Sequence, residues 1–348
     1  MSSPPSLAEI EAHLDHLTKP PGSLGRLERL AARLCHILGT LQPETRPRRL
    51  CLFAGDHGVA AAGVTEWPSE VTGLMIANIV GGGAASSALA ASSKTELEVI
   101  DVGSLSEPLA EVPGYLCRKV RSGTRDLTKD PALTIDEWRQ AAGVGRERAR
   151  SAADAGCRVV AAGEMGIGNT TPSACLAMLL ADVPLEGAVG RGAGAGDETF
   201  ARKQRIVRDA VERARRPLAT RADNVDLETA IAAVGGLEIA AMAGFFTEAH
   251  RLGLAVVLDG VIATAAALAA ERLVPGVRAS LIAAHRGVEP AHGAMLDVLE
   301  LEPMLDWELR LGEGTGALLL MPLLDAAAAM VREMATFGDL ELAGPGTD

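Results

Sequence analysis

Three glycine-rich stretches of the sequence carry isolated charges, and the first is "VVAAGEMGIGNTTPSA" at 159–174. An apolar run typical of a buried strand reaches Glu164, and Gly166 and Gly168 follow, where a backbone can turn tightly and approach a ligand closely. Asn169 and Thr170 stand where a helix would begin, with side chains that donate hydrogen bonds. The stretch predicts a phosphate-binding loop, and the alternative is a plain strand–helix turn whose glycines serve packing. It is not a Walker loop, because no GK[ST] follows.

The second stretch is "GRGAGAGDETFARK" at 190–203, with Arg191 before its glycines and Lys203 after them. A helix that begins near Asp197 would carry Lys203 two turns in, from where its ammonium group could lean back toward the loop. We interpret the stretch as a second anion contact. The alternative is a flexible surface linker followed by a solvated helix.

The third stretch is "RLGEGTGALLLMPLLDAA" at 310–327, where Glu313 lies between Gly312 and Gly314 just before an apolar helix. A carboxylate in such surroundings is partly desolvated, which raises its pKa and makes it a better base near neutrality. Glu313 is therefore a candidate general base. The alternative is that Glu313 and Thr315 only cap the helix.

Asp56 and His57 follow another apolar run, and His285, Arg286 and His292 form a later polar group. Adjacent residues of a strand point to opposite faces, so a structural or substrate-orienting pair is favoured over a metal site. Widely spaced histidines give no zinc-ligand pattern, and we expect neither a metal nor a cofactor. No Gly-x-Ser-x-Gly elbow is present, which argues against nucleophilic hydrolysis.

Bulk properties narrow the class of protein further. The 348 residues carry a net charge of −12 with no basic block, which excludes non-specific binding of nucleic acid. Five widely spaced cysteines give neither a disulfide framework nor a zinc motif. The first residues do not resemble a signal peptide, and no uninterrupted apolar run is long enough for a membrane span. We expect a cytoplasmic protein that binds small molecules.

Short apolar runs must position these groups, and Ala-rich helical stretches separate them. This alternation predicts an α/β fold with a doubly wound, mainly parallel sheet and helices on both faces. The expected strands lie at 50–58, 97–103, 158–169, 255–261 and 279–287, and the expected helices at 135–155, 172–182, 199–215, 236–251 and 316–336. In such sheets ligands bind beyond the carboxyl ends of the strands, where the polar residues recur. We predict a large catalytic domain at 49–312 and a small helical domain from 1–48 and 313–348.

Taken in order, these motifs resemble the nicotinate-nucleotide:dimethylbenzimidazole phosphoribosyltransferase family of cobalamin nucleotide-loop assembly. The resemblance runs from residue 17 to residue 327, and its strings are long and specific to the family. The matching strings are "LTKPPGSLGRLE", "FAGDHGV", "WPSEVT", "GEMGIGNTT", "GRGAGAGD" with Lys203, "GGLEIAAMAG", "VVLDGVIATAAAL", "AHRGVEPAH" and "LRLGEGTGALLLMPLLDAA".

The resemblance implies that a phosphoribosyl group moves from nicotinate mononucleotide to a benzimidazole nitrogen, with inversion at the anomeric carbon. It implies that Glu313 is the general base and that Glu164 supports the ribosyl centre where positive charge develops. The substrate-binding positions that it implies are Gly166, Gly168, Asn169, Thr170 and Lys203 near the phosphate, with Leu74, Asp56, His57 and Gly312 elsewhere in the site. The family forms homodimers with the active site close to the interface.

The chain departs from the family pattern at three positions. Leu74 stands close to the expected base pocket, where many relatives have Gln, so the identity of the base is left open. Ala193 replaces a frequent threonine and Gly196 a frequent aspartate.

Other classes of function also remain open. The same reaction on adenine, another azole or a phenol is one alternative, and a catalytically silent nucleotide-binding protein is another. A dinucleotide oxidoreductase is disfavoured because no first-strand GxGxxG is present. An enzyme that uses a pyrophosphate-activated sugar is disfavoured because "VVLDGV" holds one aspartate, where adjacent acidic residues would be expected.

Overall fold

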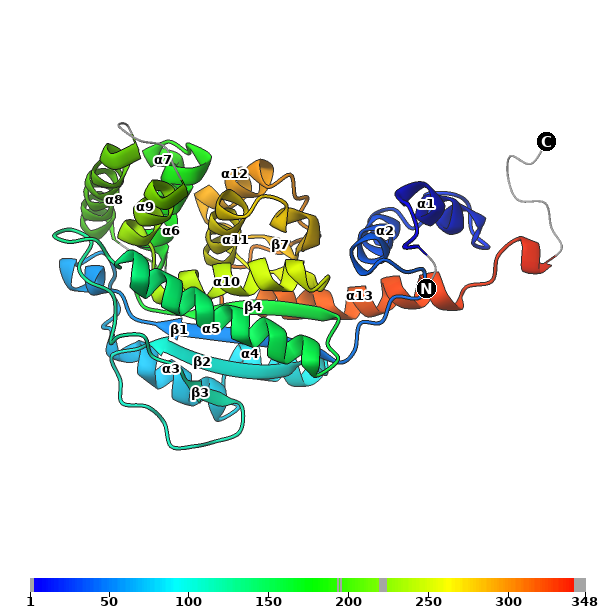
Figure 1. Cartoon of the computed structure of the whole chain (residues 1–348), viewed down its shortest axis with the longest axis horizontal. Helices are drawn as coiled ribbons and strands as arrows, with labels where there is room; N and C mark the ends of the chain where they lie inside the picture. Colours follow the sequence, from blue (N-terminus) through cyan, green and yellow to red (C-terminus); the bar gives the residue numbers. More distant parts are fainter. Residues whose placement is uncertain (1–2, 193, 195, 219–223, 341–348) are drawn as a thin grey trace.

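Six parallel strands form the central sheet, in the order β3-β2-β1-β4-β5-β6 (Figure 1). The computed structural model describes residues 3–192, 194, 196–218 and 224–340. The strands are β1 (Arg48–Gly55), β2 (Glu96–Gly103), β3 (Tyr115–Cys117), β4 (Val159–Met165), β5 (Ala255–Leu258) and β6 (Leu281–Ala283). A second, two-stranded sheet pairs β7 (His285–Arg286) with β8 (Leu305–Asp306). The strand order reverses between β1 and β4, so the predicted doubly wound parallel fold is confirmed.

Alternate residues of β1 enter different parts of the core, as the two-residue period of a strand requires. Cys51 and Phe53 pack with the helices α5 (Ile135–Asp154) and α10 (Leu237–Arg251), where Phe53 meets Phe245 edge to face at 5.9 Å. Leu50 points the other way, into the cluster that holds α13 (Thr315–Glu333). The strand is buried on both faces, which explains why its sequence is apolar after the two arginines at its start.

Small residues let α5 and α10 approach each other closely. A Cβ at Gly145 would overlap the carbonyl group of Ala241, and one at Gly244 would overlap that of Ala142. The side chains at this contact are mostly alanine, so the two helices pack almost backbone to backbone. This packing accounts for a core with only 3% aromatic residues.

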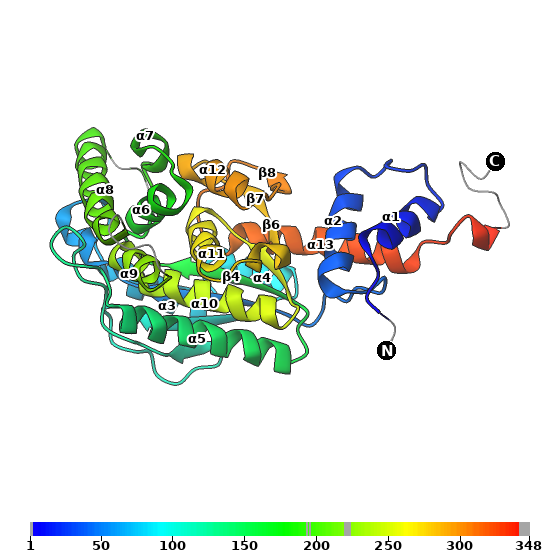
Figure 2. The same cartoon turned by 45° about the horizontal axis from the view of Figure 1, so that its top comes forward.

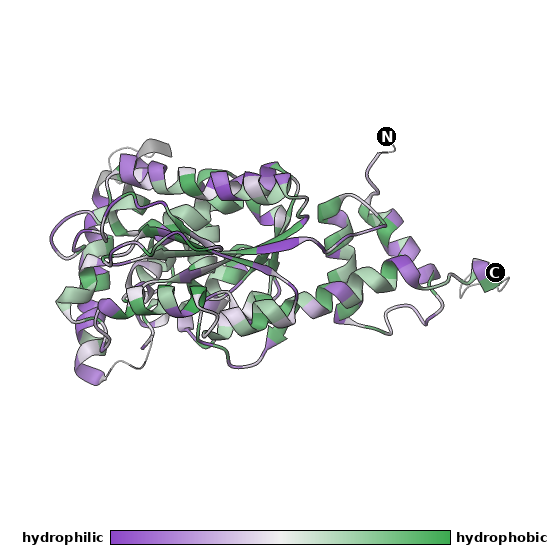
Figure 3. Ribbon diagram, turned by 90° about the horizontal axis from the view of Figure 1, so that it is seen from below, coloured by the Kyte–Doolittle hydropathy of each residue, from purple (hydrophilic) through white to green (hydrophobic). Residues whose placement is uncertain are grey.

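Helices cover both faces of the sheet (Figures 1 and 2). The sheet face of α5 and α10 also carries α6 (Thr170–Ala181), α7 (Leu185–Ala188), α8 (Asp197–Leu218), α9 (Asn224–Val234), α11 (Val261–Leu273) and α12 (Pro290–Val298). The opposite face carries α3 (Glu70–Val80), α4 (Ala85–Ser92) and α13. Three short 3-10 turns lie at η1 (Gly58–Ala62), η2 (Val277–Ser280) and η3 (Gly338–Leu340). Hydrophobic residues follow the central strands, and hydrophilic ones gather on the outer helix faces (Figure 3).

The helices α1 (Leu7–His16) and α2 (Arg26–Leu38) lie beside the far end of α13, away from the sheet (Figures 1 and 2). The same helix α13 contacts α4, β4 and β5 nearer its beginning. It therefore joins the sheet to the small helical bundle. The boundaries 49–312 for a large domain and 1–48 with 313–348 for a small one stay a prediction.

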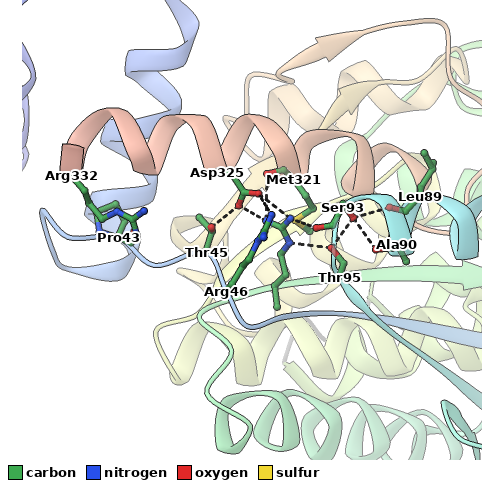
Figure 4. Close-up of polar contacts among 11 residues, drawn as sticks. Pro43, Thr45, Arg46, Leu89, Ala90, Ser93, Thr95, Met321, Asp325 and Arg332 are labelled. Atoms are coloured by element: carbon green, nitrogen blue, oxygen red, sulfur yellow. Dashed lines mark hydrogen bonds and ion pairs between the residues drawn. The ribbon is translucent and has the colours of Figure 1, made fainter. Parts of the chain in front are cut away.

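A buried ion pair fixes this junction (Figure 4). The Arg48 side chain is fully buried, and its guanidinium group pairs with Asp325 of α13 at 2.6 Å while donating to Thr95 and to the carbonyl of Ser93. Arg46 and Thr45 donate to the same carboxylate, each at 2.6 Å. These hydrogen bonds hold the pKa of Asp325 below its usual value although burial acts the other way.

Two segments of the described residues, 70–92 and Thr315–Glu333, are long and apolar enough to cross a membrane by length and composition alone. The first is broken at 81–84 into α3 and α4, and the second is the mostly buried α13. Core helices pass the same test, so this is weak evidence. The expectation that no segment spans a membrane stays a prediction.

Candidate active site

A cavity opens at the carboxyl ends of β4, β5 and β6, beside the point where the strand order reverses. Its lining residues are 64–67, 164–170, 191–192, 260–262, 285, 287–289, 309–313 and 315. All three glycine-rich stretches of the sequence thus reach one cavity. Seven of the predicted site residues line it, namely Glu164, Gly166, Gly168, Asn169, Thr170, Gly312 and Glu313.

The loop after β4 packs tightly on the end of β1. A Cβ at Gly166 would overlap the carbonyl group of Gly55, and Gly168 has a left-handed φ of +93°. Both glycines are therefore required by the local backbone, whatever ligand the loop holds. The Asn169 amide donates a hydrogen bond to Glu164 Oε2, so without a ligand this side chain serves the carboxylate.

Glu164 is buried at the floor of this loop. Burial raises its pKa to about 8, with further rises from Asp259 and Glu238, while the hydrogen bond from Asn169 acts in the opposite direction. The carboxyl group is consequently mostly protonated at neutral pH in the ligand-free protein. A cation placed beside it would favour its ionised form.

Glu313 sits in a strained turn that directs its carboxylate into the cavity. Its φ is +58°, between Gly312 at +84° and Gly314 at +75°. A Cβ at Gly163 would stand 2.7 Å from the Gly314 nitrogen, so β4 also leaves room only for glycine beneath the turn. Burial raises the pKa of Glu313. These features suit a general base, because a left-handed non-glycine residue persists only where its surroundings hold it.

Asp259, which follows β5, holds this turn from below. Its carboxylate accepts hydrogen bonds from the backbone N–H groups of Gly314 at 3.0 Å, Gly316 at 2.7 Å and Ala317 at 3.3 Å. His285 Nε2 lies 3.7 Å from Asp259 Oδ1. The negative charge of Asp259 at the first turn of α13 also interacts favourably with the positive end of the helix dipole.

Lys203 lies behind the cavity wall and joins two loops. The helix α8 begins at Asp197 as predicted, and Lys203 Nζ donates to Thr170 Oγ1 at 2.8 Å and to the Gly190 carbonyl at 3.0 Å. Burial lowers its pKa to about 8. Arg191 reaches the cavity itself, stacks over Phe200 at 4.9 Å and pairs with Asp197. Ala193 lies outside the described residues, and Gly196 N approaches Glu66 Oε1 at 3.5 Å.

Asp56 and His57 lie beneath the cavity and do not line it. Asp56 accepts hydrogen bonds from Thr72 at 2.6 Å and from the Leu105 N–H at 2.8 Å. His57 Nε2 faces Glu238 Oε1 at 2.8 Å on the other side of the sheet. The two neighbours bond in opposite directions, as strand geometry predicts, and both brace the glycine loop.

His285 and His292, like Asp56 and His57, each contact a different partner. His292 faces Thr264 at 3.1 Å and accepts from the Gly287 N–H at 2.9 Å, and burial lowers its pKa to about 4. Within the described ranges, no three histidine, cysteine or acidic side chains come together in a way that could hold a metal ion.

The structure places Leu74 on the surface of α3, and its contact with the acceptor base stays a prediction. Its side chain is 69% exposed on α3 and is absent from the cavity lining of this chain. The helical phase of α3 directs it outward, while Thr72 and Ile76 are buried. Trp67, from the "WPSEVT" string, lines the cavity instead and gives it a flat aromatic wall.

Sequence reasoning also missed two buried polar residues. Ser86 of α4 donates a hydrogen bond to Glu313 Oε2, and Glu238 of α10 holds His57. Glu238 stands in the quoted string "GGLEIAAMAG", but nothing local marks its partner. Nothing in the Ala- and Ser-rich sequence around Ser86 distinguishes it from the neighbouring serines.

A doubly wound sheet whose switch point holds a glycine loop, a buried lysine and two carboxyl groups of raised pKa defines a nucleotide-dependent group-transfer enzyme. The chain belongs to a phosphoribosyltransferase family, whose model matches residues 3–341. It is 45% identical to the nicotinate-nucleotide–dimethylbenzimidazole phosphoribosyltransferase of Thermus thermophilus, over 96% of this chain and 97% of the relative. The Geobacter sulfurreducens protein of the same name is 42% identical over 97% and 94%.

A solved structure is similar over almost the whole chain. The crystal structure of CobT from Thermus thermophilus matches with a TM-score of 0.90 and 44% identity, covering 97% of this chain and 98% of that one. The similarity includes both the sheet and the terminal helices.

Proposed function

We propose that this chain transfers the phosphoribosyl group of nicotinate mononucleotide to 5,6-dimethylbenzimidazole, giving α-ribazole 5′-phosphate and nicotinate in cobalamin nucleotide-loop assembly. The observation that carries the proposal is the pair Glu164 and Glu313, both buried with raised pKa values, on one cavity beside a glycine loop. Near full-length relatives that bear the name of this enzyme support it.

The reaction needs no covalent intermediate. The unprotonated azole nitrogen uses its lone pair to form a bond to C1 of the ribose, on the face opposite nicotinate. The bond between C1 and the nicotinate nitrogen breaks, and its electron pair stays on that nitrogen. The azole N–H proton passes to Glu313, whose raised pKa suits proton removal near neutral pH.

The nucleotide places a cation, the pyridinium ring of nicotinate, beside Glu164. The pyridinium ring and the positive charge that develops at C1 favour the ionised carboxylate, which then stabilises the transition state. The N–H groups of the glycine loop and of the start of α6 hold the phosphate, and Lys203, bonded to Thr170, supplies positive charge behind them. Asn169 is released from Glu164 to a ligand oxygen in this arrangement.

The acceptor base lies against the apolar part of the lining. Val64, Trp67, Val288, Leu309 and Leu311 line the cavity together with Glu313. A flat aromatic base buries its rings there while its N–H faces the carboxylate. Gly312 leaves room for Glu164, since a Cβ at this position would overlap Glu164 Oε1.

The working molecule in this proposal is a homodimer in the cytoplasm that needs no cofactor. Exposed apolar side chains close to the cavity support the dimer, with Trp67 51% and Leu74 69% exposed. A second copy covering α3 would bring a partner's surface to Leu74. Sedimentation equilibrium of the wild type and of Leu74→Asp tests this, since a dimer through α3 dissociates on introduction of the charge.

The test of the reaction is product formation from nicotinate mononucleotide and 5,6-dimethylbenzimidazole, with Glu313→Gln as the matched variant. We expect α-ribotide formation by the wild type and loss of turnover, without loss of nucleotide binding, in the variant. Turnover only with adenine, another azole or a phenol would assign the same chemistry to a different acceptor. Nucleotide binding with no reactive acceptor would identify a silent binding protein.

A further inference from the structure

Ser86 is a buried residue of α4 that contacts the candidate base from a distant part of the chain. It lies in the first turn of α4 and is 0% exposed. Its hydroxyl group donates a hydrogen bond of 3.1 Å to Glu313 Oε2. No other side chain in the described part of the chain hydrogen-bonds this carboxylate, so Ser86 fixes its rotation.

The backbone strain at Glu313 makes this contact important. The turn 312–314 sets where the side chain begins, and Asp259 fixes that turn through three backbone N–H groups. The outer torsions of the Glu313 side chain are set by contacts to its carboxylate, and both the side chain and the backbone of Ser86 hydrogen-bond that group. The Ser86 hydroxyl donates to Oε2, and Glu313 also lines the cavity.

We propose that Ser86 is a positioning residue for Glu313, holding Oε2 so that Oε1 meets the N–H of the acceptor base. This inference rests on the proposed function, in which Glu313 removes the acceptor's proton. In this proposal Ser86 contacts neither the substrate nor the reacting atoms. The role belongs to the side chain of this residue, since a helix with alanine here would keep its backbone and lose the hydroxyl.

The electrostatics of the site agree with this role. Burial raises the pKa of Glu313, and the side-chain and backbone hydrogen bonds from Ser86 act against that rise. The other ionisable groups that face Glu313 are Asp259 after β5 and Glu164 at the end of β4, with His285 beside Asp259. The Asp259 carboxylate repels a charge on Glu313, whereas the Ser86 hydroxyl stabilises the ionised base.

Ser87 offers a matched control on the same helix. Its hydroxyl donates to the Ile79 carbonyl at 2.7 Å and does not contact Glu313. Ser86→Ala and Ser87→Ala each remove one serine hydroxyl and one hydrogen bond from the first turn of α4. A loss of stability is common to both variants, whereas a change in the base belongs to Ser86→Ala alone.

The first experiment compares the pH profiles of kcat for the wild type, Ser86→Ala and Ser87→Ala. We expect the acid limb of Ser86→Ala to move upward by about one pH unit, because a hydrogen bond to a charged group is lost. Its kcat at neutral pH falls about 10-fold, and the KM for nicotinate mononucleotide stays within about 2-fold of the wild type. Ser87→Ala keeps the wild-type profile. Coincident profiles of both variants and the wild type would overturn the proposal.

A second measurement does not require turnover. Carbon-13 NMR titration of the Glu313 carboxyl in the ligand-free enzyme, assigned by its loss in Glu313→Gln, reports its ionisation directly. We expect a higher midpoint in Ser86→Ala and an unchanged midpoint in Ser87→Ala. An unshifted midpoint in Ser86→Ala contradicts the Ser86 role, while a shifted midpoint in an enzyme that turns over no acceptor contradicts only the proposed function.

Discussion

The Asp259 carboxylate accepts a hydrogen bond of 2.7 Å from the backbone N–H of Gly316, three residues beyond the candidate base. The first turn of α13 is thereby tied to the end of β5. Because β5 is an inner strand of the sheet, this contact fixes the candidate base to the central layer of the fold. The position of Glu313 therefore depends on both carboxylate oxygens of Asp259, which accept hydrogen bonds from the turn that follows Glu313.

Asp259→Asn tests this dependence. The amide keeps the size of the carboxylate but replaces one acceptor oxygen with a donor, which faces backbone N–H groups that are donors too. We expect kcat to fall about 100-fold, since a displacement of about 1 Å has that effect on a positioned group. Steady-state kinetics with the exposed Asp297→Asn as control checks the result. Equal kinetics in the two variants would contradict the role of Asp259.

We expect Lys203 to make nucleotide binding sensitive to pH. Burial lowers its pKa to about 8, so the ammonium group loses its charge as the pH rises through that value. Affinity for nicotinate mononucleotide is therefore expected to be highest below about pH 8 and to fall above it. Calorimetric titrations across this range measure the effect.

Lys203→Met should raise the Kd for nicotinate mononucleotide about 10- to 100-fold and remove the alkaline decline, because a charge-assisted hydrogen bond is lost. Lys129→Met is the control, since this lysine side chain is 77% exposed and pairs with Asp126, three residues before it. An alkaline decline that persists in Lys203→Met would assign it to another group.

Ionisation of the buried Glu164 should lower the stability of the fold as the pH rises. Its pKa is about 8 in the fold against an ordinary value of 4.5, so the stability from its neutral form is complete below about pH 4.5 and is lost as the pH rises through 8. Glu164→Gln replaces the carboxyl group with an amide of similar shape that stays uncharged at every pH. Its melting temperature should equal that of the wild type near about pH 4.5 and exceed it by several degrees near about pH 9. Thermal unfolding at both values tests this, and a constant difference would be inconsistent with the raised pKa.

Binding of nicotinate mononucleotide should release a proton from Glu164. The carboxyl group is mostly neutral below about pH 8, and the positive charge of the pyridinium ring beside it favours its ionisation. Titration calorimetry in buffers of different ionisation enthalpy counts the released protons. Glu164→Gln should bind without this release, and a release that survives the substitution would point to another group.

The Arg48–Asp325 pair should contribute strongly to stability. Asp325→Asn leaves the fully buried guanidinium group without its counter-charge, and breaking such a pair costs about 3 kcal/mol. Urea denaturation measures the loss. Glu333→Gln, which removes an exposed partner of Arg332 on the same helix, should cost less than about 1 kcal/mol.

The sequence predicts the elements of this fold better than their contacts. Continuous apolar runs mark β1, β2, β4, β5 and β6, and the polar residues at their ends mark the cavity. The three-residue β3 is too short to give a periodic signal. The order of the strands depends on non-local pairing, so it follows from the fold class and not from any local pattern.

The site shows the same limit at the level of single residues. Glu164 and Glu313 were predictable because glycines surround each carboxylate in the sequence. Leu74 was placed in the pocket by family likeness, whereas the phase of α3 turns it outward. The Ser86–Glu313 contact joins residues 227 positions apart, and no local pattern encodes such a pair.

The helix α13 connects the candidate base to the small helical bundle. It begins two residues after Glu313 and runs for 19 residues, roughly 28 Å, to the helices near the N-terminus. Arg48 of β1 pairs with Asp325 near the middle of α13, and Asp259 after β5 holds the first turn of the same helix. The small bundle and the candidate base are therefore attached to opposite ends of one helix, which two contacts fasten to the central sheet.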